Sequence, residues 1–151
     1  SVTAGWRQKG FVENLPEGLE IVASLPGNWD RLRAADIANT AVIRHPDLAA
    51  VFAANDNMAL GAAEALLARG IKGVKVIGVD GIGDAVKAIR GGRLTASIAQ
   101  LPYLMGADAV EKAHKFVNGQ AIFEFDQKVP IVTLDKDVLS RGDEPLLRYL
   151  R

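Results

Sequence analysis

Short apolar runs alternate with amphipathic stretches along the whole chain. Runs of about six residues rich in Ala, Val, Ile and Leu have the length and character of buried strands. Between them, apolar residues recur at three- and four-residue steps, which is typical of helices that bury one face. The pattern predicts strands at residues 19–25, 49–54, 74–79, 94–99 and 129–134, and helices at residues 3–14, 31–44, 57–69, 84–90 and 102–118.

Strands that alternate with helices in this way predict an α/β fold with a doubly wound parallel sheet. The order has one irregularity, because the pattern begins with a helix, whereas a right-handed strand–helix–strand unit needs a strand before it. We therefore expect the sheet to lack its first strand. The residues after Asp135 have no clear pattern and stay unassigned.

Length and composition narrow the classes of protein. The 151 residues are enough for one domain, and 18 basic residues balance 18 acidic ones, so no overall field favours nucleic acid or an anionic membrane surface. The absence of cysteine excludes disulfides, thiolate chemistry and cysteine-ligated zinc. No apolar run approaches the roughly 20 residues that span a bilayer, so we expect no membrane insertion. The chain starts at Ser1, and we interpret it as mature, trimmed or partial.

Polar residues follow three of the predicted strands at the point where each strand ends. Asn55, Asp80 and Gln100 hold these positions, and Trp29 lies in the loop that leaves the first predicted strand. The carboxyl ends of parallel strands meet at one edge of a sheet, where ligands bind. Amide and carboxylate groups satisfy neighbouring hydroxyl groups, and an indole ring covers the apolar face of a sugar. The pattern predicts a site for a hydroxyl-rich ligand.

Asn55, Asp80 and Trp29 also have purely structural interpretations. Asn55 and Asp56 are both good helix caps, and we expect Asp56 to take that role. Asp80 precedes Gly81 as in a common turn, and Trp29 is large enough to be a core anchor.

Catalytic, metal-binding and cofactor-binding patterns are not found. Residues 78–83 resemble a phosphate loop only superficially, because the glycine order and the lysine of such loops are missing. His45 and His114 lack metal-ligand spacing. We predict no catalytic residue, no metal and no cofactor, and therefore a protein that is not an enzyme.

Five segments together resemble the periplasmic monosaccharide-binding proteins of the ribose- and allose-binding type. They are RQKGF (7–11), NWDR (28–31), VFAANDNMALG (51–61), VIGVDG (76–81) and LTASIAQLP (94–102). The resemblance extends from about residue 2 to residue 135 and covers the C-terminal lobe of such a protein. In that family two α/β lobes close on the sugar, so the resemblance implies a flavodoxin-like lobe whose N-terminal partner lobe is absent.

The resemblance implies a function and a set of binding residues. The protein would bind a monosaccharide or sugar alcohol in the periplasm or outside the cell and deliver it to an ABC transporter permease, with a chemoreceptor as a further partner. The implied sugar contacts are Arg7, Trp29, Asn55, Asp80 and Gln100. Ribose binders have an aromatic residue before the aspartate, where this chain has Val79. The stacking surface therefore differs, and the sequence does not name the sugar.

The resemblance also divides the chain. Residues 1–100 would form the incomplete sugar-binding lobe, and residues 101–130 would be a crossover segment that packs on the absent lobe. Residues 131–135 would be a return strand, and residues 136–151 a tail.

Two alternative functions stay open at this point. The effector-sensing core of a LacI-type transcription regulator shares the fold, although such cores usually have a second acidic residue where this chain has Gly81. A flavodoxin-like or Rossmann-type enzyme is the third interpretation, and the missing phosphate loop disfavours it.

Overall fold

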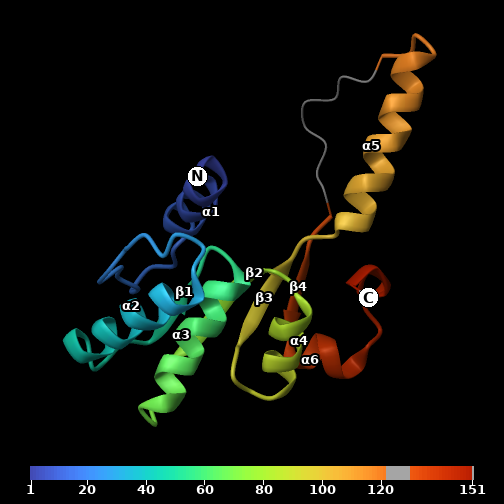
Figure 1. Cartoon of the computed structure of the whole chain (residues 1–151). Coiled ribbons are helices and arrows are strands. Elements are labelled where there is room, and N and C mark those ends of the chain that lie inside the picture. The colour runs from blue at the N-terminus through green and yellow to red at the C-terminus, as the bar shows by residue number, and fades with distance from the viewer. Residues whose placement is uncertain (122–129, 151) are drawn as a thin grey trace.

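The computed structural model describes residues 1–121 and 130–150. The chain follows the predicted order of helices and strands (Figure 1). All five predicted helices are present, and so are four of the five predicted strands, although residue 129, the start of the last one, lies outside the described residues. The elements are α1 (Val2–Glu13), α2 (Arg31–Arg44), β1 (Ala50–Phe52), α3 (Asp56–Ala68), β2 (Lys75–Asp80), α4 (Gly83–Arg90), β3 (Ala96–Ala99), α5 (Pro102–Val117), β4 (Val132–Asp135), α6 (Lys136–Arg141) and the short 3-10 helix η1 (Pro145–Leu150).

The sheet has the order β1-β2-β3-β4, and its first three strands are parallel. This confirms the predicted α/β class. The last strand differs from the prediction, because β4 runs antiparallel to β3. The register explains this direction: Val132 at the start of β4 pairs with Ala99 at the end of β3. A chain that returns to the sheet at the end where it left can only run back along its neighbour.

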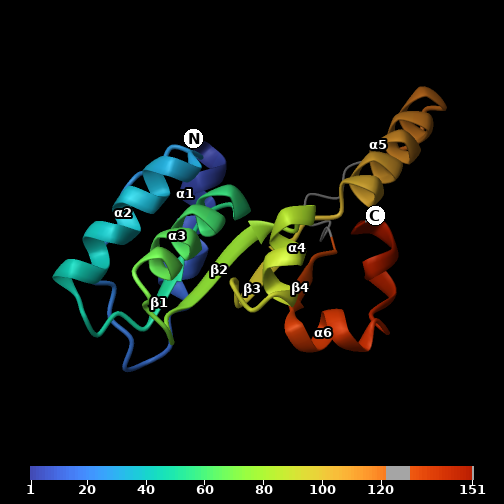
Figure 2. The same cartoon turned by 60° about the horizontal axis from the view of Figure 1, so that its bottom comes forward.

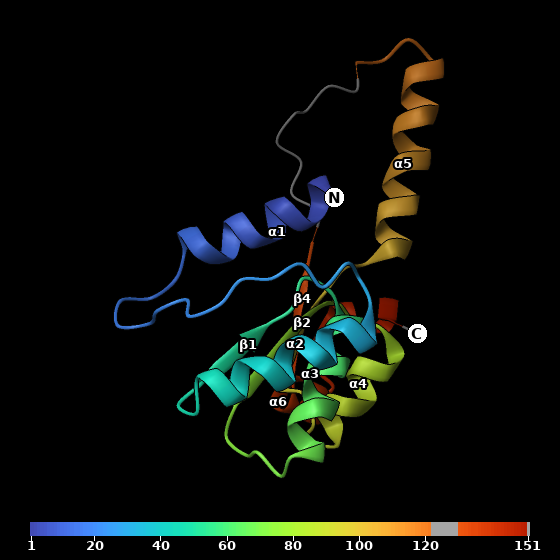
Figure 3. The ribbon, with the colours of Figure 1, turned by 60° about the vertical axis from the view of Figure 1, so that its left-hand side comes forward.

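Helix α3 is the centre of the core. Nine of its residues are buried, because Ala, Leu and Met occupy almost every side of the helix. It packs between α2 and β2 (Figure 3). Helix α4 contacts β3 and β4. Figure 2 shows α6 beside β4 and α4, so the tail beyond Asp135, unassigned from sequence, belongs to the fold. Leu134 of β4 and Ile89 of α4 are almost completely buried there.

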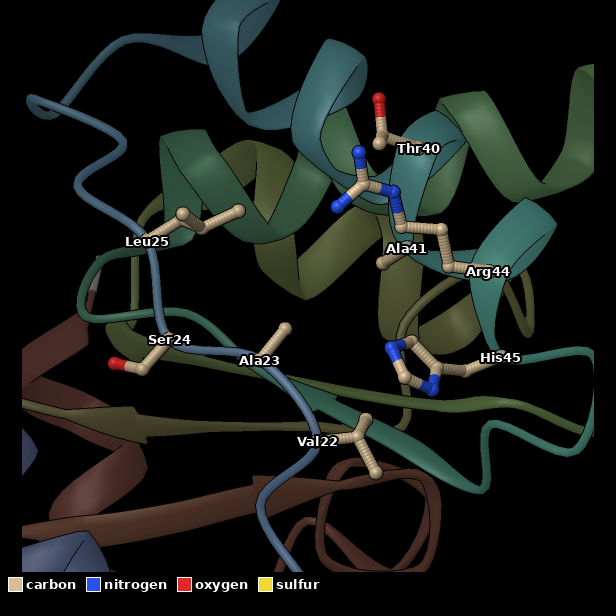
Figure 4. Close-up of a pocket in the computed structure, with 8 residues that line it drawn as sticks. All are labelled: Val22, Ala23, Ser24, Leu25, Thr40, Ala41, Arg44 and His45. Carbon is tan, nitrogen blue, oxygen red and sulfur yellow. The ribbon is translucent and has the colours of Figure 1, made fainter.

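The predicted strand at residues 19–25 was wrong. This segment pairs with no strand of the described sheet, and Leu19 and Leu25 are 56% and 58% exposed. It passes the end of α2, from which a cavity of about 160 Å³ separates it (Figure 4). The apolar pattern is that of a strand, but a strand needs a neighbour for its backbone N–H and C=O groups. Because residues 19–25 do not pair with β1, β1 is the edge strand of the described sheet.

Helix α5 projects away from the rest of the molecule (Figures 1 and 3). None of its residues is buried, and three of its apolar side chains, those of Val110, Phe116 and Val117, are more than 60% exposed. At its first turn the Tyr103 ring stacks on Tyr149 of η1, with ring centroids 5.4 Å apart. None of the helices in the described ranges is long and apolar enough to cross a membrane.

Candidate binding site at the carboxyl edge of the sheet

Asp80 is the central residue of the candidate site. It ends β2, and its Oδ1 accepts hydrogen bonds from Arg7 Nη2 at 2.9 Å and from Gln100 Nε2 at 2.5 Å. The Gln100 backbone N–H also donates to the Asp80 carbonyl oxygen, at 3.2 Å. Arg7 of α1 therefore meets Asp80 and Gln100 at the edge of the sheet where the strand-end rule places those two residues.

Arg7 connects this cluster to β1 and to the loop before α2. Its Nη1 donates to the carbonyl oxygen of Ala54 at 2.6 Å, just beyond the end of β1. Its guanidinium lies 5.8 Å from the centroid of the Trp29 ring, which is cation–π distance. The Arg7 side chain is only 18% exposed and that of Asp80 is 29% exposed. Partial burial strengthens this ion pair relative to one in open solvent.

Trp29 is held by an unusual turn. Asn28 and Trp29 both have positive φ angles, 53° and 64°, which residues with side chains rarely adopt. Asp30 follows and caps α2, because its Oδ1 accepts a hydrogen bond from the Arg33 N–H at 2.6 Å. The Trp29 side chain is partly buried and packs against the core. The structure therefore supports the core-anchor interpretation for part of the ring, and the ligand-covering role stays a prediction.

Asn55 takes the capping role that we expected of Asp56. Asn55 is the N-cap of α3, in extended conformation, and its Oδ1 accepts a hydrogen bond from the Met58 N–H at 2.9 Å. Asp56 is already the first helical residue, so its side chain leaves the helix end and points toward the strands. The prediction that Asp56 caps α3 was wrong for this reason. The cap uses Oδ1 of Asn55, whose side chain is buried, and the neighbouring Ala54 carbonyl oxygen accepts the Arg7 hydrogen bond.

Asp56 is the functional candidate that sequence reasoning missed. Its carboxylate is completely buried and accepts hydrogen bonds from the Gly81 N–H at 2.7 Å, the Ile82 N–H at 2.9 Å and the Ser97 Oγ–H at 2.7 Å. The pKa of Asp56 is raised overall. Burial is the main cause and the negative charge of Asp80 adds to it, and together they outweigh the three hydrogen bonds, which lower the pKa. Its spacing from Ala59 and Ala63 places it on a buried helix face, which was the available indication.

Two cavities of the described structure lie away from this cluster. The one in Figure 4 is lined by residues 22–25 and the end of α2. A more open one, of about 400 Å³, is lined by Asp135, Asp137, Ser140 and Arg141. Neither is lined by Arg7, Asp80 or Gln100.

Comparison with known proteins finds a family and many relatives. The family model described as periplasmic binding protein domain matches residues 1–121. The ribose import binding protein of Escherichia coli is 44% identical over 117 residues, which cover 77% of this chain and 40% of that protein. The D-allose-binding periplasmic protein of the same species is 42% identical over 108 residues, covering 70% of this chain and 35% of that protein.

Solved structures agree with these relatives. A periplasmic solute-binding protein of Actinobacillus succinogenes with bound D-allose superposes with a TM-score of 0.78 at 34% identity, covering 89% of this chain and 47% of that one. A solute-binding protein of Agrobacterium vitis bound to α-D-tagatopyranose gives a TM-score of 0.86 at 25% identity, covering 97% of this chain and 49% of that one. The chain therefore spans less than half the length of each of these relatives.

Proposed function

Because the chain belongs to the family of periplasmic binding protein domains, we propose that it is one lobe of a sugar-binding protein that serves an ABC import transporter. The ligand is a monosaccharide or sugar alcohol held at the carboxyl edge of the sheet. The observation that carries this proposal is the cluster of Arg7, Asp80 and Gln100. Arg7 and Gln100 both donate hydrogen bonds to the Asp80 carboxylate, and these bonds fix the polar groups at the end of the parallel strands.

The chemistry of the cluster fits a ligand rich in hydroxyl groups. Both donors to Asp80 reach Oδ1, and a carboxylate has about four acceptor sites, so the group keeps acceptor capacity for ligand hydroxyls. Arg7 has five N–H donors, and Gln100 has a carbonyl oxygen. Hydrogen bonds to charged groups contribute about 1.5–3 kcal/mol each. A few of them supply much of the roughly 8 kcal/mol of micromolar binding.

Trp29 and Asn55 complete the proposed set of contacts. One face of the Trp29 ring is near Arg7, and the indole gives a sugar an apolar surface on which its C–H groups stack. Asn55 would contribute its Nδ2 donor, since its Oδ1 is used by the helix cap. Relatives named for ribose and for allose support this class of ligand, and so does the related structure with bound α-D-tagatopyranose.

We propose that the cleft is completed by a second lobe outside this chain. The limited coverage of the relatives supports this, and so does α5, whose apolar residues are exposed and project beyond the lobe. Residues 101–130 would then be the crossover segment, although residues 122–129 lie outside the described ones. The closed two-lobe form would dock on an ABC transporter permease in the periplasm or at the cell surface, with a chemoreceptor as a further proposed partner.

Calorimetry with D-ribose, D-allose and sugar alcohols on the complete protein tests the proposal. We expect one of these to bind, and we expect Asp80→Ala to weaken binding by at least about 100-fold, as the loss of two hydrogen bonds to a charged group implies. Asp84→Ala is the matched control, because Asp84 is 64% exposed and pairs with Lys87 along the surface of α4. The proposal fails if no polyol binds or if Asp80→Ala binds like the parent.

The alternative functions are weaker after the comparisons. The relatives reported above are named as import, periplasmic or solute-binding proteins, and none of these names supports a transcription regulator. A helix-turn-helix encoded upstream of Ser1 would favour the regulator, whereas a signal peptide there would favour the binding protein. Flavin absorbance or nucleotide binding in the purified protein would favour an enzyme.

A further inference from the structure

The turn that follows β2 has a conformation that needs support from its surroundings. Asp80 has a φ angle of 121° and Gly81 one of 77°, so two consecutive residues lie in the left-handed region. For a residue with a side chain such as Asp80 this conformation is unfavourable, and it persists only where neighbouring groups impose it. This unusual backbone sets the direction in which the Asp80 carboxylate meets Arg7 and Gln100.

The buried carboxylate of Asp56 binds this turn directly. Its Oδ2 accepts from the N–H groups of Gly81 and Ile82, the two residues after Asp80, at 2.7 and 2.9 Å. Its Oδ1 accepts from the Ser97 hydroxyl at 2.7 Å, and Ser97 Oγ lies 3.1 Å from the Gly81 nitrogen as a second acceptor. Asp56 and Ser97 are both completely buried. One side chain of α3 thus joins the end of β2 to the middle of β3.

Two glycines make room for this arrangement. A Cβ atom on Gly78 of β2 would collide with Asp56 Oδ1, and a Cβ atom on Gly81 would collide with the side chain of Ala99. The carboxylate therefore occupies space that β2 leaves open at Gly78. An isolated buried charge is unfavourable, and the hydrogen bonds from the turn and from Ser97 offset that cost.

Helix capping does not account for Asp56, because Asn55 already caps α3. We propose that Asp56, together with Ser97, is a positioning residue of the sugar site, which holds residues 80–82 in the conformation that aims the Asp80 carboxylate at the ligand. This inference rests on the proposed function, in which Asp80 contacts the sugar. Asp56 itself is buried behind the turn and acts only through Asp80.

A double-mutant cycle tests this role on the complete protein, with D-ribose and D-allose as calorimetric probes. Ser97→Ala removes one hydrogen bond to Asp56 and one acceptor for the turn, and we expect it to lower affinity about tenfold in the parent. In the Asp80→Ala background we expect Ser97→Ala to change affinity less than about twofold, because the group that Ser97 positions is gone. Equal fold-changes in both backgrounds would mean a general structural role and would overturn the proposal.

Variants of Asp56 add a second readout. Asp56→Ala removes both acceptors, and we expect a larger loss than for Ser97→Ala, whereas Asp56→Asn keeps an oxygen for the two N–H groups and should bind within about threefold of the parent. If Asp56→Ala does not fold, the Ser97→Ala cycle decides alone.

Thr95→Val is the matched control, since the Thr95 hydroxyl accepts from the Val76 N–H at the opposite end of these strands. Asp80→Ala without effect would refute the proposed function instead, so the two failures are distinguishable.

Discussion

Gly61 allows α3 and the first residue of α2 to pack closely, and its substitution by alanine gives a sharp test of this packing. Gly61 lies in the middle of α3, directly under the start of α2. A Cβ atom there would overlap the backbone carbonyl oxygen of Arg31 and would come within 2.9 Å of its carbonyl carbon. A backbone carbonyl cannot rotate away as a side chain does. Gly61→Ala therefore forces the first turn of α2 outward.

The expected size of the effect follows from two opposed contributions. Alanine in a helix interior stabilises the helix by about 1 kcal/mol relative to glycine. Overpacking of a tight core contact costs about 1–3 kcal/mol. Gly10→Ala in α1 is the matched control, because Gly10 is an exposed helical glycine and a Cβ atom added there would meet nothing within 4 Å. Both variants gain the same helix propensity, so the difference between them isolates the overlap, and we expect Gly61→Ala to be the less stable by about 1–3 kcal/mol.

Urea or thermal unfolding of the two variants and the parent measures this difference. One kcal/mol corresponds to about 2–4 °C in melting temperature for a protein of this size. Because Trp29 lies two residues before α2, we also expect Gly61→Ala to weaken the proposed binding of sugar. The reasoning about close packing is refuted if Gly61→Ala is as stable as Gly10→Ala.

The remaining predictions concern a cap, an ion pair and the last strand, β4. Asn55→Asp keeps the cap oxygen, but Asn55 is buried, where a new charge is costly, so we expect a lower unfolding free energy and, because the amide donor is lost, a weaker affinity by calorimetry. The hydrogen bond from Arg31 lowers the pKa of Glu64 from 4.5. The stability that Glu64 contributes is therefore present above pH 4.5 and is lost as pH falls through its lower folded pKa. Glu64→Gln should lower the unfolding free energy above pH 4.5 by about 0.2–1 kcal/mol, as for exposed pairs, and should abolish this pH dependence. Leu134→Ala should destabilise by about 2–5 kcal/mol, because the side chain is completely buried in β4. Ile131→Ala, three residues earlier and 61% exposed, should be close to neutral in the same unfolding experiment.

Much of the candidate site could be expected from local pattern. Asn55, Asp80 and Gln100 each follow an apolar run, and the rule that parallel strands end at one edge brings them together without any knowledge of contacts. The structure adds the direct links, since Arg7 and Gln100 both bind Asp80 Oδ1. Arg7 came from the family resemblance alone, because a single arginine in an exposed helix has no pattern that marks it.

The roles of Asn55 and Asp56 could not be separated from sequence. Both residue types are good caps, and a shift of one position decides which side chain meets the helix end. The structure begins α3 at Asp56, so Asn55 caps and the Asp56 carboxylate turns toward Ser97, 41 residues later in the chain. A hydrogen bond over that separation depends on the pairing of β2 with β3 and leaves no local trace.

The sequence by itself determined which residues are apolar, and hence the helices, most strands and the α/β class of this protein. Periodicity reports that a segment buries one face, and that is a local property of the chain. Only the tertiary structure decided which partner each segment has. Residues 19–25 have a strand pattern but pair with no described strand, and β4 runs antiparallel because it returns where β3 ends. Strand pairing is a contact between distant residues, so its presence and direction depend on the path of the whole chain.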